Sequence, residues 1–140
     1  MSIELGALIK LLNKDLSLEY TAMVQYTQHS GVLTGAEYGD IIKEIKIHAA
    51  EELQHAITLA EQIDYLEGFP TAEVVPAKTS QDNREMLEQD LAGELDAIAR
   101  YKQRIIQAEE LQELALAQKL REILSIEQEH AMDLRNALGH

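Results

Sequence analysis

The chain has 140 residues, of which 46% are hydrophobic, and it carries a net charge of −13 and no cysteine. This is enough apolar sequence for one domain with a buried core, which we expect to span residues 1–140. The lack of cysteine excludes disulfides, thiolate metal sites and iron–sulfur clusters, and the negative charge argues against nucleic acid or an anionic membrane as a partner and favours the attraction of cations.

The sequence also contains no apolar run near the roughly 18 residues of a membrane span. Its first ten residues, MSIELGALIK, are amphipathic and do not have the basic-then-apolar order of a secretory signal. We therefore expect a cytoplasmic protein without a membrane partner.

Apolar residues recur at steps of three and four through four successive segments, which is the period of an α-helix. The connection Glu67–Gln81 is long and holds both prolines, whereas the other two connections are short. This pattern predicts an all-α four-helix bundle in which a long crossover joins two helical hairpins, the ferritin-like connectivity. The predicted helices run from Ile3 to Val32, from Ala36 to Leu66, from the cap candidates at 79–82 to Ala108, and from Leu111 to Leu138.

The two halves of the chain resemble each other at an offset of 75 residues. LSLEYTAMVQYTQ (16–28) aligns with LAGELDAIARYKQ (91–103), and the Glu-x-x-His of EELQH (51–55) aligns with that of IEQEH (126–130). We interpret the halves as a duplicated hairpin, whose matching residues lie around a pseudo-two-fold axis.

Each predicted helix places one glutamate in phase with its inward apolar residues, near mid-length. Four bare carboxylates in a bundle core are unfavourable, because each buried charge costs several kcal/mol unless it is compensated, and no lysine or arginine shares these inner positions. Two divalent cations would neutralise them, and two histidines, each one helical turn beyond a glutamate, add neutral ligands suited to iron, manganese or zinc. The six candidate metal ligands are Glu19, Glu52, His55, Glu94, Glu127 and His130.

A single Glu-x-x-His is a weak signal, since glutamate is abundant here and such a pair often lies on a solvated helix face. The full set is far more specific. It has one glutamate on each of two helices and Glu-x-x-His on each of the other two, all in core phase and at one offset. We favour metal binding over a polar network that only sets the helix register.

At these residues the sequence resembles the bacterioferritins, in the ferritin-like di-iron carboxylate family, over nearly all of its length. The matching segments are EYTAMVQYTQH (19–29), LEGFP (66–70) and LAGEL (91–95). The resemblance implies that Glu52 and Glu127 bridge two iron ions, with manganese as an alternative metal. It divides the other ligands into two pairs, Glu19 with His55 and Glu94 with His130.

Tyr26 matches a tyrosine of that family that lies near the di-iron site and can supply an electron, and by this resemblance we assign it a catalytic role. Leu53 stands where bacterioferritins ligate haem with a methionine, so we expect no haem. Leu59 and Asp133 replace the aromatic residues that the family places one turn beyond each ligand histidine. The family's short fifth helix, which helps to build its multi-subunit shell, is not expected after His140, and this leaves the formation of a cage open.

Two other groups of similar bundles fit less well. Rubrerythrins need a further glutamate where this chain has Ala97, and the DNA-protecting mini-ferritins build their metal site between subunits, whereas six ligands lie here in one chain. His48 lies one turn before Glu52; we favour a partly exposed helix residue over a residue that supports the ligands from behind, and we assign His29 no role. Tyr101, the repeat partner of Tyr26, either hydrogen-bonds a ligand carboxylate or only packs.

The predicted function is a di-iron ferroxidase that oxidises Fe(II) with O2 or H2O2, serving iron storage or detoxification. One alternative is a non-storing di-metal enzyme, such as a peroxidase, an oxygenase or a manganese catalase-like protein. A second alternative is a structural or partner-binding bundle without catalysis. Apolar residues on the outer faces predict a homo-oligomer, at least a dimer: Leu18, Val24, Ile47 and Ile57.

Overall fold

The computed structural model describes residues 3–140, which form four long helices and no strand. The all-α prediction is therefore confirmed. A short 3-10 turn, η1 (Ala36–Tyr38), precedes the second helix. Within the described range, no helix has the length and apolar composition needed to cross a bilayer. The helices are α1 (Leu5–Val32), α2 (Gly39–Tyr65), α3 (Asn83–Glu110) and α4 (Leu114–Leu138).

The helix ends follow from local chemistry. Asp82 caps α3, because its carboxylate accepts a hydrogen bond from the Glu85 backbone N–H over 2.8 Å. Gly139 ends α4 in a left-handed conformation, with φ of 82°. The predicted start of α4 at Leu111 is wrong by three residues, since Gln112 takes a φ of 59° and breaks the helix there.

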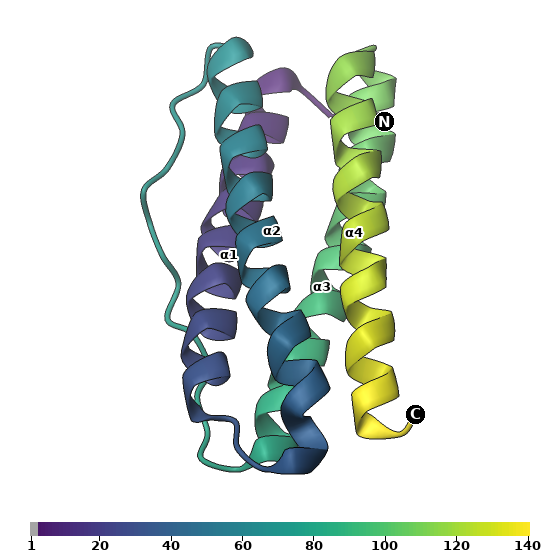
Figure 1. Cartoon of the computed structure of the whole chain (residues 1–140). Helices are drawn as coiled ribbons and strands as arrows, with labels where there is room; N and C mark the ends of the chain where they lie inside the picture. The colour runs from purple at the N-terminus through teal and green to yellow at the C-terminus, as the bar shows by residue number, and fades with distance from the viewer. Residues whose placement is uncertain (1–2) are drawn as a thin grey trace.

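The four helices pack as two hairpins, α1 with α2 and α3 with α4, and α1 also lies beside α3 and α2 beside α4 (Figure 1). Residues 66–82 travel the length of the bundle before α3 begins, so α2 and α3 run in the same direction (Figure 1). The predicted crossover connectivity is confirmed.

The crossover lies along α1 and is held there by a row of polar side chains. Gly68 is required where it leaves α2, because a Cβ at that position would meet Ile9 Cγ2 at 2.6 Å. Each side chain of the row bonds a backbone N–H or carbonyl of the crossover over 2.7–3.1 Å. The row has one member every four residues: Asn13, Ser17, Thr21, Gln25 and His29.

The core consists of two apolar clusters, one toward each end of the bundle. One contains Leu8, Leu12 and Leu16 of α1, and the other contains Tyr26 and Leu33 of the same helix. The interval between them on every helix carries the inward glutamates that the sequence analysis singled out. Apolar packing at both ends therefore fixes the helices around a polar layer at mid-length.

A buried ion pair also joins α1 to α3. Asp15 is fully buried and accepts from Arg104 Nε over 2.8 Å and from Arg100 Nη1 over 2.6 Å. Both guanidinium groups are thus engaged with Asp15, one helical turn away from Glu19 on α1.

Candidate metal centre

The structure brings all six predicted ligands together in the polar layer. Glu19 comes from α1 and Glu94 from α3, while α2 and α4 each supply a Glu-x-x-His pair. Helical spacing explains each pair, because residues three apart project from the same face of a helix. None of the six residues is more than 6% exposed: Glu19, Glu52, His55, Glu94, Glu127 and His130.

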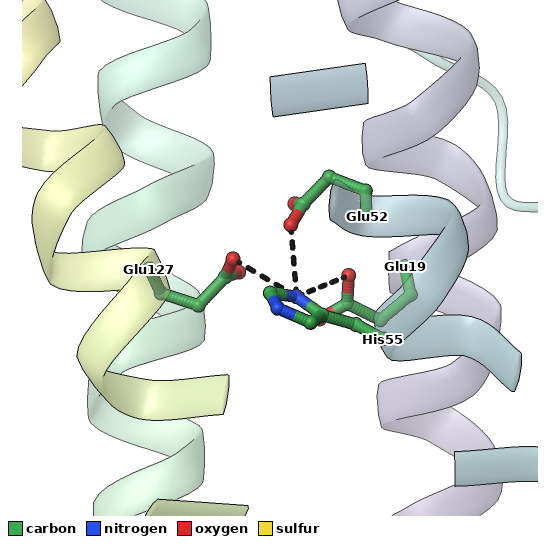
Figure 2. Close-up of side chains that lie close together, drawn as sticks. All are labelled: Glu19, Glu52, His55 and Glu127. Atoms are coloured by element: carbon green, nitrogen blue, oxygen red, sulfur yellow. Dashed lines mark ion pairs between the residues drawn. The ribbon is translucent and has the colours of Figure 1, made fainter. Parts of the chain in front are cut away.

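The first group of ligands surrounds His55. Its Nδ1 lies 3.1 Å from Glu52 Oε1, 3.3 Å from Glu127 Oε1 and 3.6 Å from Glu19 Oε2. Figure 2 shows the three carboxylates, from three different helices, all pointing toward this one nitrogen.

The second group surrounds His130 in the same way. Its Nδ1 lies 3.2 Å from Glu94 Oε2, 3.4 Å from Glu127 Oε1 and 3.7 Å from Glu52 Oε1. Glu52 and Glu127 therefore belong to both groups, and within each group one ligand atom from every residue lies within 4.8 Å of the others. Two metal positions that share two carboxylates fit this arrangement.

Comparisons with known proteins identify the family of the chain. Residues 9–140 match the ferritin-like domain. The chain belongs to the ferritin-like family. It is 36% identical to the bacterioferritin of Brucella melitensis over 123 residues, which are 87% of this chain and 76% of that protein.

Solved structures of ferritin-like proteins superpose closely on this chain. A ferritin-like diiron-carboxylate protein from Bacillus anthracis gives a TM-score of 0.92 at 33% identity and covers 99% of both chains. The bacterioferritin-related protein of Bacteroides fragilis, described as a dodecameric thioferritin, gives 0.90 at 30% identity and covers 99% of this chain and 88% of its own. The family resemblance seen in the sequence is confirmed.

Burial and the repulsion between like charges shift the pKa values of the carboxylates in the metal centre. Burial, followed by the charges of Glu19 and Glu127, raises the pKa of Glu52 well above its usual range. Burial and the charge of Glu127 raise the pKa of Glu94 to about 8. Although burial opposes it, the contacts of Glu127 with His130 and His55 hold the pKa of that carboxyl below its usual range.

The pKa values of His55 and His130 are raised, whereas burial alone would lower the pKa of an imidazole. Burial lowers the pKa of His55, but contacts with Glu127 and Glu19 outweigh it and raise the value to about 9. Contacts with Glu127 and Glu94 likewise overcome burial and raise the pKa of His130 to about 11. Without a metal, protons on these groups compensate the crowded carboxylates.

The donor set fits a pair of divalent cations. Both oxygens of Glu52, and Oε1 of Glu127, are buried and have no hydrogen-bond partner within residues 3–140. The Nδ1 atoms of His55 and His130 are also without a hydrogen-bond partner in that range. Unpaired buried oxygens and nitrogens that converge on one point cost free energy, and coordination to iron or manganese would satisfy them.

The pseudo-symmetry of the centre is broken by two tyrosines. The Tyr101 hydroxyl donates to Glu19 Oε1 over 2.6 Å, so the first of the two expectations for Tyr101 is confirmed. Its repeat partner Tyr26 is equally buried, but its hydroxyl has no hydrogen-bond partner among the described residues. Burial and the charge of Glu94 raise the pKa of Tyr26, which keeps this hydroxyl protonated.

Outside the six ligands, the surroundings of His130 were only partly predicted. Its Nε2 contacts Glu51 Oε1 at 3.0 Å, a contact that orients the ring. The expectation that His48 is partly exposed is wrong, because His48 is 1% exposed and its ring stacks on that of His130 with centroids 3.9 Å apart. Packing of α2 against α4 creates this stack, which the sequence of one helix cannot reveal.

A small cavity of about 80 Å³ opens beside the centre between α1 and α3. Glu19, Glu94 and Tyr26 line it, together with small residues such as Ala22 and Gly93. This volume has room for a few water-sized molecules. The cavity borders the ligand layer, because Glu19, Glu52, Glu94 and Glu127 all line it.

Proposed function

We propose that this chain is a ferroxidase that binds two iron ions at the six buried residues and oxidises Fe(II) with O2 or H2O2. The observation that carries the proposal is the pair of ligand groups that share Glu52 and Glu127. In the proposed site Glu52 and Glu127 would be the two carboxylates that hold both metal ions. Glu19 with His55 completes one site, and Glu94 with His130 completes the other.

The residues suit a two-electron reaction. The two bound Fe(II) ions supply both electrons that the oxidant accepts. Four carboxylates favour the harder Fe(III) over Fe(II), which promotes oxidation. Burial of all six ligands keeps bulk water away from the centre and strengthens each carboxylate's electrostatic effect. Metal binding must displace the protons held by Glu94, His55 and His130, so binding releases protons.

Tyr26 is the proposed catalytic residue beside the metals. Its ring lies edge-on to that of His130 with centroids 6.1 Å apart, and it lines the cavity next to Glu94. The Tyr26 hydroxyl is protonated and has no hydrogen-bond partner in the described chain, so it could give one electron and one proton where the reduction of O2 goes beyond the two electrons that the Fe(II) ions supply. Tyr101 is already bonded to Glu19 and is not placed for this role.

The proposal includes a homo-oligomer of at least two copies. Three of the four outer-face residues named from the sequence are exposed, namely Val24, Ile47 and Ile57, and Leu53 of α2 is exposed as well. Such a group of large apolar side chains favours burial against another copy. The dodecameric description of the Bacteroides fragilis relative supports this part of the proposal. With Leu53 at the haem-ligand position of bacterioferritins, we expect no haem.

Stopped-flow oxidation of Fe(II) by the metal-free protein tests the chemistry. We expect rapid oxidation by the wild type and loss of that phase in Glu127→Ala, which removes a ligand of both metals. Glu129→Ala is the matched control, because Glu129 lies two residues away on α4 and is exposed. Wild-type rates in Glu127→Ala would refute the site, and a loss in both variants would mean that the effect is not specific to the ligand.

The alternatives separate by simple observations. Iron that remains bound at about two ions per chain after desalting indicates a non-storing enzyme, whereas a far larger amount indicates storage. The small cavity favours O2 or H2O2 over an organic substrate. A structural bundle would bind no metal tightly, and its stability would be unchanged by a chelator.

A further inference from the structure

We propose a third metal site, separate from the dinuclear centre, in which Glu44 and His48 of α2 and Asp133 of α4 bind a single divalent first-row transition ion. None of the six ligands of the centre takes part in it. The site therefore does not depend on the ferroxidase proposal, and it is tested by binding alone.

The geometry of the three residues is that of a ligand set. His48 Nε2 lies 3.0 Å from Asp133 Oδ2, and one ligand atom from each of the three residues lies within 4.8 Å of the others. Glu44 precedes His48 by four residues, so both side chains project from the same face of α2. One imidazole with two carboxylates is a donor set that suits Fe(II), Mn(II) or Zn(II).

The imidazole is held in place before any metal arrives. His48 is 1% exposed and lies between two rings, stacked on His130 and edge-on to Tyr26 with centroids 5.1 Å apart. Its Nδ1 is buried without a hydrogen-bond partner in residues 3–140. Asp133, by contrast, has a side chain that is 41% exposed, and Glu44 is exposed. The site thus joins a fixed, buried ligand to two carboxylates at the surface, which leaves coordination positions open to water.

The surface in front of this site is strongly acidic. A groove runs over η1, the start of α2 and the end of α4, and none of the eight residues that line it is basic. Its charged lining residues are Glu37, Asp40, Glu44 and Asp133. A concave surface with four carboxylates raises the local concentration of cations. The groove therefore supplies the ion, and His48 provides the nitrogen that distinguishes a transition-metal site from a diffuse acidic patch.

A purely structural role for the His48–Asp133 pair makes a different prediction. In that role Asp133 would only hold His48 against His130, and the protein would bind no more metal than the dinuclear centre takes. In the proposed role the protein binds one additional ion, and that ion is lost when Asp133 loses its charge. Counting bound metal therefore separates the two.

The test is equilibrium dialysis against Zn(II), which is not oxidised, followed by measurement of metal per chain. We expect about three ions in the wild type and about two in Asp133→Asn. Asp40→Asn is the matched control, since it removes the same charge from the same groove without touching the ligand set, and it should still bind about three. An equal count in the wild type and in Asp133→Asn would overturn the proposal.

A second pair of variants isolates the site from the centre. Glu52→Ala combined with Glu127→Ala removes both shared carboxylates and should leave about one Zn(II) per chain. Adding Asp133→Asn to this double variant should abolish binding of the remaining Zn(II) ion. Retention of the last ion after Asp133→Asn would place it elsewhere and refute the assignment to Glu44, His48 and Asp133.

Discussion

Replacing Tyr101 by phenylalanine should destabilise the metal-free protein measurably, because it removes the donor of a buried hydrogen bond. The hydroxyl donates to Glu19 Oε1 over 2.6 Å, and both residues are at most 2% exposed. Leaving a buried acceptor unpaired costs about 1–3 kcal/mol. We expect the free energy of unfolding to fall by about that amount, since Phe fills nearly the same volume and the loss is confined to the hydroxyl.

Tyr26→Phe is the matched comparison, because Tyr26 is the repeat partner of Tyr101. Its hydroxyl is buried but has no hydrogen-bond partner in the described chain. Removing an unpaired buried hydroxyl relieves a desolvation cost, so the free energy of unfolding should stay constant or rise by about 1 kcal/mol. The same chemical change at two related positions is thus predicted to have opposite consequences.

Equilibrium unfolding in urea, in the presence of a chelator, measures both changes. The slope of the unfolding free energy against urea should be the same in all three proteins, so the comparison depends on the midpoints alone. Equal losses in the two variants, or a larger loss in Tyr26→Phe, would refute the inferred asymmetry of the centre.

Three further predictions concern the ion pair, the pH dependence of metal binding and the partner of His130. Arg104→Leu leaves Asp15 buried with only Arg100 as its partner and should lower the free energy of unfolding in urea by about 1.5–3 kcal/mol, the value of a buried hydrogen bond to a charged group. Arg121→Leu, which breaks an exposed pair with Glu109, should cost at most about 1 kcal/mol. The pKa values are raised to about 8 for Glu94, about 9 for His55 and about 11 for His130, so all three groups hold protons at neutral pH. Because a metal ion must displace these protons, the affinity for Zn(II) should rise as the pH increases toward these values. Calorimetry in buffers of different ionisation enthalpy should detect proton release, and its absence would contradict these shifts. Glu51→Ala removes the contact with His130 Nε2 and should lower the affinity for one of the two Zn(II) ions of the centre by about 10–100-fold in a competition titration. An unchanged affinity for both ions would show that Glu51 does not orient the ring.

The helices and the six convergent residues were predictable because they depend on periodicity within each helix. Glu19 and Glu94 stand in phase with inward leucines, and in a four-helix bundle all inward faces meet along one axis. The phase of a residue on its own helix was thus enough to place it in the layer. The offset of 75 residues showed which ligands of the two halves correspond to each other, because related hairpins pack around a pseudo-two-fold axis.

The contacts that the sequence did not reveal all depend on which segments become neighbours. Ser17 and Thr21 look like a solvated polar face, yet they bond the backbone of the crossover more than 50 residues away. The pairing of Asp15 with Arg104 spans 89 residues. The burial of His48 depends on how α2 packs against α4. A polar residue on a helix carries no local signal that separates exposure to solvent from a distant partner.

Anomalous X-ray diffraction from crystals soaked in Fe(II) is the most direct measurement of the central claim that six residues hold two metals. At the iron absorption edge the account predicts two peaks in the ligand layer. Glu52 and Glu127 should each contact both metals, His55 should contact one and His130 the other. A single peak in the layer, or none while iron binds elsewhere, would contradict the account.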